Sequence, residues 1–362
     1  MFFPFECVIF ASEFQPLLVM YTVSIIIPVY NVSAYIQRCL ESVVAQATDA
    51  ARIECLLVDD CSTDDSIAVA EAYFSTYDGS VSFRILHHEV NQGQSVARNT
   101  GVAAAQGDYL LFLDADDHLV PGSLMLMLEA LRTHPEADVV DGAFYHCEDR
   151  KSYPPCKEMR FLTNRNEILK NFYKGRLSLC AWNKLIRRDF FIYHVLYFVK
   201  GIVFEDIQWS NRLFHCIDSI LVLPDVTYIY EYNPCSTMNT THINATKSIR
   251  SFVRVFADLI NTSERDVYVD HKIFIFHYIL NAMDILHKGN VNPQVRDDLM
   301  LIKRRLYGQV VKDGRLILSL YFLLMFQPFY SLLRWSMFRH HVHELERGVA
   351  FLANRFQCFH KF

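Results

Sequence analysis

The chain has few glycines, and none of them is arranged to bind a dinucleotide or a nucleoside triphosphate. It contains 12 glycines in 362 residues, and no two of them form a G-x-G pattern. The G-x-G-x-x-G fingerprint of dinucleotide-binding folds is therefore absent, as is the G-x-x-x-x-G-K-S/T loop that holds triphosphates. These absences exclude the sequence signatures of the common dehydrogenases and of P-loop ATPases.

The sequence also lacks the patterns of a zinc site, a calcium loop and a nucleophile elbow. None of the 10 cysteines forms a C-x-x-C pair, so we expect reduced cysteines in a reducing compartment. A calcium loop starting at Asp114 needs glycine sixth and glutamate twelfth, and these positions hold Leu119 and Met125. In "GQSVA" (93–97), Ala97 replaces the second glycine of a nucleophile elbow.

Charge is distributed unevenly, although the net charge is only −5. From Leu301 onward there are ten Lys/Arg against three Asp/Glu, whereas the first 300 residues hold 25 against 37. Such a basic segment can face phospholipid head groups, and a solvated basic face is the alternative. We expect a peripheral membrane contact through 315–362 and no nucleic-acid binding, because the rest of the chain is acidic.

A charge-free stretch within this basic segment bears on the same question. Residues 316–333 are at the lower length limit for a membrane span, and Gln327-Pro328 interrupts them. A buried helical hairpin and an interfacial helix remain the two favoured interpretations, ahead of a true span. We expect a cytoplasmic protein that acts at the inner face of the cell membrane.

The first residues are read as an N-terminal extension, 1–22. They are apolar but lack the basic region of a signal peptide, and they contain Glu6 and Glu13. Met20 is the alternative start, because "MYTVSIIIPVYN" opens directly on a strand, and we favour it.

Apolar runs typical of buried strands alternate with helical periodicities between residues 23 and 145. "VSIIIPVY" is a β-branched run of the kind buried on both faces of a sheet. Strands are predicted at 23–30, 53–60, 82–88, 109–117 and 137–146, and helices at 32–46, 62–77, 94–106 and 121–134. This order predicts a mostly parallel sheet covered by helices, with ligands at the carboxyl ends of the strands.

Acidic residues follow two of these strands. Asp59 and Asp60 end "CLLVDD", and Asp114, Asp116 and Asp117 end "YLLFLDADD". Mg²⁺ and Mn²⁺ take one or two carboxylates together with substrate phosphates and water. Side chains two apart on an extended segment point the same way, which would aim Asp114 and Asp116 at one ion. The alternative is that Asp116 or Asp117 caps the next helix.

Four segments together are similar to the family 2 glycosyltransferases, inverting enzymes of the GT-A fold, of the type that assembles bacterial polysaccharides. They are "VSIIIPVYNVSAYIQRCLESVVAQ", "LLVDDCSTDDS", "NQGQSVARNTGVAAAQGDYLLFLDADD" and "PGSL". The resemblance implies an α/β GT-A domain over 23–240, with a nucleotide-sugar half 23–145 and an acceptor half 146–240. A helical, basic C-terminal extension, 241–362, would follow.

The resemblance also implies a donor site. Its candidate residues, which bind the base, the ribose, the diphosphate or the metal, are Pro28, Tyr30, Asp60, Gly93, Arg98, Asp114 and Asp116. Pro28 and Tyr30 would line the base, Asp60 would bind uracil, and Asp114 would contact the ribose or the metal. Asp116 would be the principal metal ligand, with Arg98 and Gly93 near the donor.

Simple chemistry agrees with these roles. A carboxylate at Asp60 that accepts the imide N–H of uracil would reject cytosine, whose N3 is itself an acceptor. Tyr30 offers a flat face for stacking, and core filling is its alternative. Arg98 could instead pair with a nearby carboxylate.

The catalytic base is expected downstream, in "GIVFEDIQWSNRLF". The family has an E-D pair here whose aspartate is taken as general base, which corresponds to Asp206, with Glu205 raising its pKa. Acids favoured by the dipole of a helix N-terminus are the alternative. Trp182 and Lys184 in "LCAWNKLIRRDFF" are candidate acceptor contacts.

The next segment, "YIYEYNPCSTMNTTH", departs from the usual family pattern. Glu231 stands where the family commonly has a cation, and His242 is a weak candidate for a metal or pyrophosphate contact.

The expected activity is metal-dependent (Mn²⁺ or Mg²⁺), inverting transfer from a nucleoside-diphosphate sugar, with UDP favoured. This is a reaction of the hexosyltransferase class. The acceptor would be a glycan or lipid-linked glycan in cell-surface polysaccharide synthesis. The alternative is a non-catalytic nucleotide-sugar or sugar-binding protein that keeps the fold. A processive synthase would need more membrane spans than the single candidate here.

Overall fold

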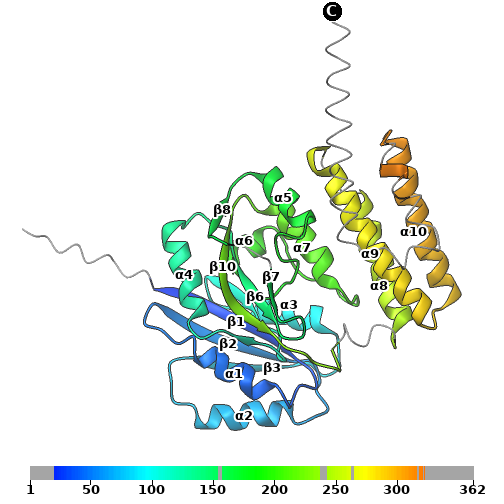
Figure 1. Ribbon diagram of the computed structural model, residues 1–362. Helices are drawn as coiled ribbons and strands as arrows, with labels where there is room; N and C mark the ends of the chain where they lie inside the picture. Colours follow the sequence, from blue (N-terminus) through cyan, green and yellow to red (C-terminus); the bar gives the residue numbers. More distant parts are fainter. Residues whose placement is uncertain are drawn as a thin grey trace, which may run out of the picture. The chain divides into compact units, whose positions relative to one another are not determined.

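The computed structural model describes residues 20–153, 157–236, 243–261, 265–315, 318–320 and 322. The chain divides into two compact units, each described by itself below (Figure 1). The first unit comprises Met1–Thr163, Cys180–Lys200 and Cys216–Tyr232, and the second Asn164–Leu179, Gly201–His215 and Asn233–Phe362. The two units therefore alternate along the chain between residues 164 and 232.

A ten-stranded sheet forms the first unit, with the main order β3-β2-β1-β4-β9-β6-β10-β5. Its strands are β1 (Tyr21–Val29), β2 (Ala51–Asp59), β3 (Ser82–His87), β4 (Tyr109–Phe112), β5 (His118–Leu119), β6 (Val139–His146), β7 (Lys151–Tyr153), β8 (Arg160–Leu162), β9 (Lys184–Arg187) and β10 (Ile220–Tyr230). Strands β3, β2, β1 and β4 are parallel, as is the pair β6–β10. The predicted parallel half is confirmed, but β9 pairs antiparallel with β4 and β6, so the whole sheet is mixed.

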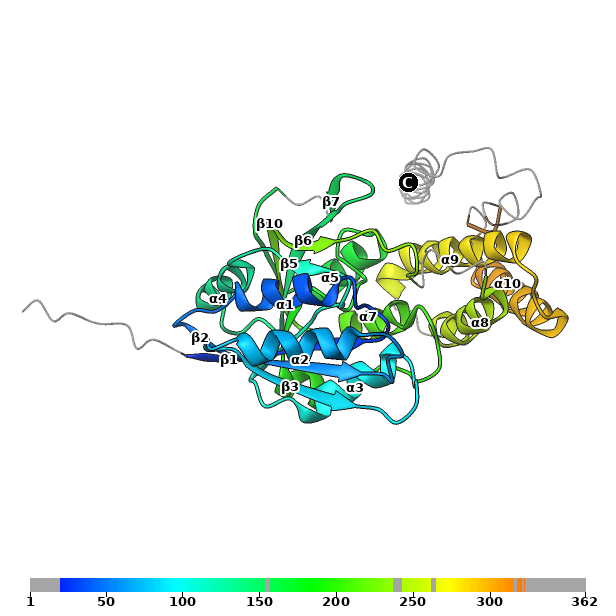
Figure 2. The same cartoon turned by 90° about the horizontal axis from the view of Figure 1, so that it is seen from below.

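Helices cover both faces of the parallel half. They are α1 (Ile36–Val44), α2 (Ser66–Thr76) and α3 (Gln94–Ala104), whereas α4 (Ser123–Thr133) packs on β6 and β10 and the short α6 (Arg188–Tyr193) packs on β9. Right-handed crossovers place α1 and α2 on one face and α3 on the other (Figures 1 and 2). β1 is buried from Val23 to Val29, as expected for a strand covered on both faces.

The carboxyl ends of the parallel strands meet at one edge of the sheet. The backbone N–H of Asp60 donates to Val29 O at 2.9 Å, and that of Leu113 donates to Ile26 O at 3.1 Å. The N–H of His88 donates to Asp59 O at 2.9 Å. These bonds bring the segments that follow β1, β2, β3 and β4 together, as the acidic strand ends predicted.

The second unit is helical in its described residues. It contains α5 (Arg165–Tyr173), α7 (Glu205–Cys216), α8 (Ala245–Asn261), α9 (Tyr268–Lys288) and α10 (Pro293–Lys312), with a 3₁₀ turn η1 (Arg265–Val267). Phe172 of α5 stacks on Phe214 of α7, with ring centroids 4.4 Å apart. The predicted C-terminal helical extension is confirmed as far as residue 312.

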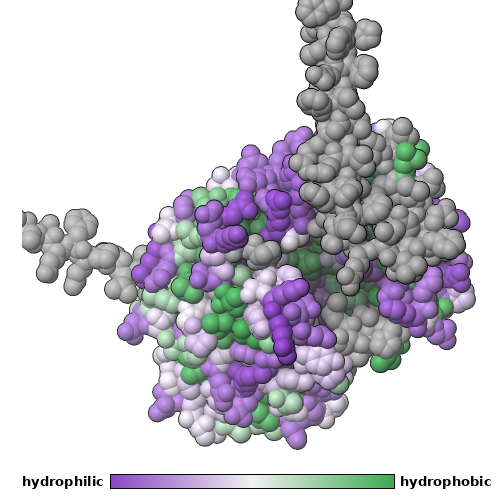
Figure 3. Space-filling view, viewed as in Figure 1, coloured by the Kyte–Doolittle hydropathy of each residue, from purple (hydrophilic) through white to green (hydrophobic). Residues whose placement is uncertain are grey.

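Two expectations about the membrane fall largely on residues that are not described. Of 316–333, only 318–320 and 322 are described, and the N-terminal extension is described only from residue 20. Within the described ranges, we find no helix that combines the length and apolar character needed to cross a membrane. Hydrophilic and hydrophobic residues are interspersed over the first unit in the view of Figure 3.

Candidate active site

The acidic residues after β4 lie in a turn rather than on an extended strand. β4 ends at Phe112, and the N–H of Asp117 donates to Asp114 O at 3.1 Å. The prediction of a strand to residue 117 was wrong, and with it the argument that alternation aims Asp114 and Asp116 the same way. The turn forms because Leu113 makes the last ladder bond to β1 and β9 pairs only as far as Leu111.

Two polar side chains from α3 hold the carboxylate of Asp114. Arg98 Nη2 lies 2.8 Å and Gln94 Nε2 lies 3.0 Å from Asp114 Oδ1. Arg98 is 1% exposed, and its guanidinium lies over the ring of Phe198, 5.2 Å from the centroid. Of the two interpretations of Arg98, the structure therefore shows the ion pair with a nearby carboxylate.

Asp117 is the buried member of the acidic turn. Its carboxyl accepts hydrogen bonds from Tyr228 Oη at 2.6 Å and from the N–H of Glu231 at 2.8 Å. Burial raises the pKa of Asp117 well above its ordinary value, and the charges of Asp116 and Asp114 raise it further. Asp117 does not cap α4, whose N-cap is Gly122 without any side-chain bond, so that alternative was wrong.

Asp60 organises the loop between β3 and α3. Its Oδ1 accepts from the N–H of Gln92 at 2.8 Å, and its Oδ2 accepts from the N–H of Gly93 at 2.7 Å. His88 Nδ1 lies 2.7 Å from Asp60 Oδ1, and His88 Nε2 lies 3.0 Å from Thr100 Oγ1. Asp60 is only 3% exposed, and both of its carboxylate oxygens already accept hydrogen bonds. A nucleotide base would therefore meet only the small exposed part of this carboxylate.

Gly93 is required by the backbone at this point. It is the N-cap of α3 with φ 90° and ψ 159°, a region that L-residues rarely adopt. An added Cβ would meet no atom within 4 Å, so the constraint comes from the dihedral angle.

The two residues predicted to line the base differ in exposure. Tyr30 is 48% exposed at the end of β1 and presents an available ring. Pro28 is buried within β1, opposite Val58, because β1 is covered on both faces. The predicted contact of Pro28 with a base is therefore not supported, whereas that of Tyr30 stays a prediction.

The two predicted acceptor contacts lie in the core of the first unit. Lys184 is 0% exposed, and its Nζ lies 2.9 Å from Oδ1 of the equally buried Asp141. Trp182 is 4% exposed and stacks on Tyr228, with centroids 4.3 Å apart. Lys184 cannot offer its charge to an acceptor from this position, so we correct that prediction to a structural role.

The predicted catalytic pair belongs to the second unit. Glu205 and Asp206 are the first residues of α7, which agrees with the predicted helix start. The preceding Phe204 has φ 60°, and its ring stacks on Phe252 of α8 with centroids 4.4 Å apart. The role of Asp206 as base stays a prediction, and His242 lies outside the described residues.

The acidic turn suits a hard divalent cation that arrives with a diphosphate. Asp114 and Asp116 supply carboxylate oxygens, the ligand type that Mg²⁺ and Mn²⁺ prefer. No group of three or more His, Cys, Asp or Glu side chains able to hold a metal occurs among the residues that the structure describes. A two-carboxylate set fits this ion when substrate phosphates and water complete its coordination.

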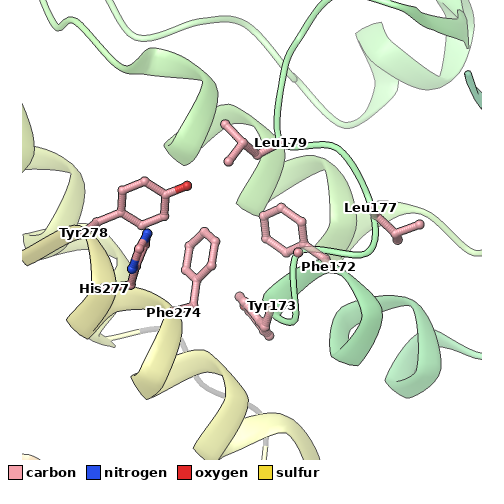
Figure 4. A pocket seen from close by; sticks show the side chains of 8 residues that line it. Phe172, Tyr173, Leu177, Leu179, Phe274, His277 and Tyr278 are labelled. Carbon is pink, nitrogen blue, oxygen red and sulfur yellow. The ribbon is translucent and has the colours of Figure 1, made fainter. Parts of the chain in front are cut away.

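An aromatic cavity of about 190 Å³ lies in the second unit, between the end of α5 and α9 (Figure 4). It is lined by Phe172, Tyr173, Gly175, Leu177, Leu179, Phe274, His277 and Tyr278. None of the residues predicted from the sequence for the donor, the metal, the base or the acceptor lines it.

Sequence reasoning missed Gln94, which bonds Asp114, and three further residues of the first unit that shape the site. His88 and Tyr228 hold the carboxyl groups of Asp60 and Asp117. Arg38 of α1 pairs with Glu231, Nη1 to Oε1 at 3.0 Å. Of these residues, only His88 could have been found from the sequence, because "LHH" ends a predicted strand at the edge where ligands are expected.

Comparisons with known proteins agree with the predicted family. Residues 24–194 match the model of "Glycosyl transferase family 2". The uncharacterized glycosyltransferase EpsJ of Bacillus subtilis is 34% identical over 59% of this chain, and the chain spans only 62% of that relative. The uncharacterized glycosyltransferase YibD of Escherichia coli is 25% identical over 80% of this chain and 84% of its own.

Solved structures show the same fold. TarS of S. aureus, solved in complex with UDP-GlcNAc, superposes with a TM-score of 0.62 at 19% identity and covers 79% of this chain and 80% of its own. This likeness confirms the predicted GT-A fold.

Proposed function

We propose, from the premise that residues 24–194 form a glycosyl transferase family 2 domain, that the protein transfers a sugar from a nucleoside-diphosphate sugar to a glycan. The donor is UDP-linked, and the transfer inverts the anomeric centre. TarS, which has the same fold, was solved with UDP-GlcNAc, and this supports a UDP-sugar for the present chain.

One observation carries this proposal: the turn that holds Asp114 and Asp116 at the carboxyl edge of the sheet. Ligands of open α/β sheets bind at this edge. The side chains of Arg98 and Gln94 fix one oxygen of Asp114, which keeps the carboxylate in place before any ligand arrives. The same edge carries Tyr30, which is exposed and able to stack on a base.

Each residue of the edge then has a defined task. Tyr30 stacks on the base, and Asp60 keeps the loop of Gly93 closed around it. Asp114 and Asp116 would hold Mn²⁺ or Mg²⁺, and such an ion would supply positive charge to stabilise the departing diphosphate.

We assign the proton transfer to Asp206. An inverting transfer needs a carboxylate within about 3 Å of the acceptor hydroxyl, on the side opposite the leaving group. Glu205 is its neighbour in the first turn of α7 and 7% exposed, and the two carboxylates supply the negative charge that favours proton uptake.

The acceptor that we propose is a growing glycan, free or carried on a membrane lipid at the cytoplasmic face, in cell-surface polysaccharide synthesis. The ten basic residues after Leu301 support a peripheral contact with anionic lipid.

A thermal-shift screen tests the proposal. Wild-type protein is melted with UDP, GDP, CMP and a set of UDP-sugars, with Mn²⁺ or with EDTA. A ligand at 100 times its dissociation constant adds about 2.7 kcal/mol, which gives a clear shift. We expect manganese-dependent stabilisation by UDP compounds, with the sugars ranked by the size of the shift.

Two variants complete the design. Asp116→Ala should lose the manganese-dependent shift, whereas Asp78→Ala, an exposed aspartate of the same unit, should keep it. A folded wild-type protein that no nucleotide stabilises would contradict the proposal, and so would an unchanged shift in Asp116→Ala. A UDP-dependent shift together with no sugar transfer to any glycan would favour the non-catalytic binding protein.

A further inference from the structure

Arg38 of α1 reaches the acidic turn from the side opposite α3. Its Nη2 donates to the backbone carbonyl of Asp116 at 3.4 Å, and its Nη1 lies 3.0 Å from Glu231 Oε1. The side chain of Arg38 is 45% exposed, so a ligand at the surface can reach it beside the residue we assign to the metal.

The two arginines at this turn differ in what they can still do. Arg98 is 1% exposed and held by Asp114 and by the ring of Phe198. An arginine fixed in this way positions a carboxylate but has no open side for a ligand. The Arg38 side chain is partly exposed, and the planar set of donors of its guanidinium matches two phosphate oxygens at once.

The backbone of Glu231 is anchored to a buried residue, whereas the contacts of Arg38 are made by a partly exposed side chain. The N–H of Glu231 donates to the buried Asp117 at 2.8 Å, and His118 Nδ1 lies 3.7 Å from Glu231 Oε1. The backbone of Glu231 is thus fixed just after β10, while Arg38 is tethered through a partly exposed ion pair, which is weak. An incoming diphosphate can therefore take Arg38 from Glu231 at small cost.

We propose that Arg38 binds the diphosphate of the donor, and that Glu231 holds its guanidinium at the site until the donor arrives. On binding, the guanidinium leaves Glu231 Oε1 and donates to a phosphate oxygen next to the Asp114–Asp116 turn. This assignment rests on the proposed function, because it requires a nucleoside diphosphate at this edge. It also accounts for the glutamate at position 231, where the family commonly has a cation. In this protein Arg38 of α1 supplies the positive charge at the site.

The test compares ligands with and without phosphate. The dissociation constant of UDP is measured by calorimetry with Mn²⁺ present, and uridine binding is followed by saturation-transfer NMR, for wild type, Arg38→Ala, Arg38→Lys and Glu231→Gln. Losing a charge-assisted hydrogen bond should weaken UDP about 10- to 100-fold in Arg38→Ala. Uridine binding should not change, Arg38→Lys should lie between, and Glu231→Gln should bind UDP at least as tightly as wild type.

Arg52→Ala is the matched control. Arg52 is an exposed arginine at the start of β2, away from the carboxyl ends of the strands where the site lies. Equal UDP affinity in Arg38→Ala and wild type would overturn the proposal. So would equal losses of UDP and uridine binding, because Arg38 would then act through the fold of the site. If wild type itself binds no UDP, the proposed function fails and this inference fails with it.

Discussion

The buried pair Lys184–Asp141 gives a prediction that distinguishes two roles for Lys184, stabilising the fold or binding the acceptor. Both side chains are 0% exposed, and their charged atoms lie 2.9 Å apart. Lys184→Met keeps the volume of the stem but leaves Asp141 buried without this partner. Breaking a buried ion pair from one side commonly costs about 3–5 kcal/mol.

A proton balance gives the same magnitude. The buried carboxyl of the variant avoids its charge by taking up a proton. For an aspartate of reference pKa about 3.9, this costs about 4 kcal/mol at pH 7 and about 1.5 kcal/mol at pH 5. In the folded Lys184→Met variant the pKa of Asp141 would be raised above its unfolded value, so the variant keeps its stability at low pH and loses it as pH rises. The loss in free energy of unfolding relative to wild type should therefore be smaller at pH 5 than at pH 7.

Urea unfolding of wild type and Lys184→Met at pH 7 and pH 5 measures both values. The double variant Lys184→Met/Asp141→Leu should recover most of the loss, because an apolar pair of similar volume replaces the ionic one. A loss below about 1 kcal/mol at pH 7, combined with reduced sugar transfer, would refute the reasoning and return Lys184 to the acceptor site.

Three further changes test the rest of the account. Tyr228→Phe removes the hydrogen-bond donor to Asp117 and should lower the free energy of unfolding in urea by about 2–4 kcal/mol. Tyr153→Phe is its control: the hydroxyl of Tyr153 bonds an exposed Asp149, so its loss should change little. Gly93→Ala should destabilise by about 1–3 kcal/mol because of its φ of 90°, whereas Gly308→Ala, in a helix with open space at Cβ, should stabilise by about 0.5–1 kcal/mol. Asp206→Asn should lower kcat about 100- to 10,000-fold and leave the UDP affinity unchanged; equal losses in kcat and in UDP affinity would speak against a base.

The parallel half of the sheet was predictable because its signals are local. Long β-branched runs such as 23–30 can be buried only in a covered strand, and the helices between them have regular apolar spacing. The antiparallel strands β5, β7, β8 and β9 were not predicted, because strands of two to four residues are too short to show a period. Tertiary pairing alone defines them.

The place of the acidic residues in the fold was predictable, but their local geometry was not. Acidic residues after strands located the edge, yet the turn at Asp114–Asp117 replaced the expected strand. Lys184 shows the main reason for the errors: charged residues are ordinarily exposed, and no sequence pattern reveals a buried partner such as Asp141. The pairing of Arg38 with Glu231 joins distant segments and was equally invisible.

The central claim is metal-dependent binding of a nucleoside diphosphate at the Asp114–Asp116 turn. The most direct measurement is a calorimetric titration of UDP into wild type and Asp116→Ala, each with saturating Mn²⁺ and with EDTA. The account predicts that manganese tightens UDP binding at least about tenfold in wild type, a gain of about 1.4 kcal/mol, and has no effect in the variant. The same affinity with and without manganese in wild type would contradict it.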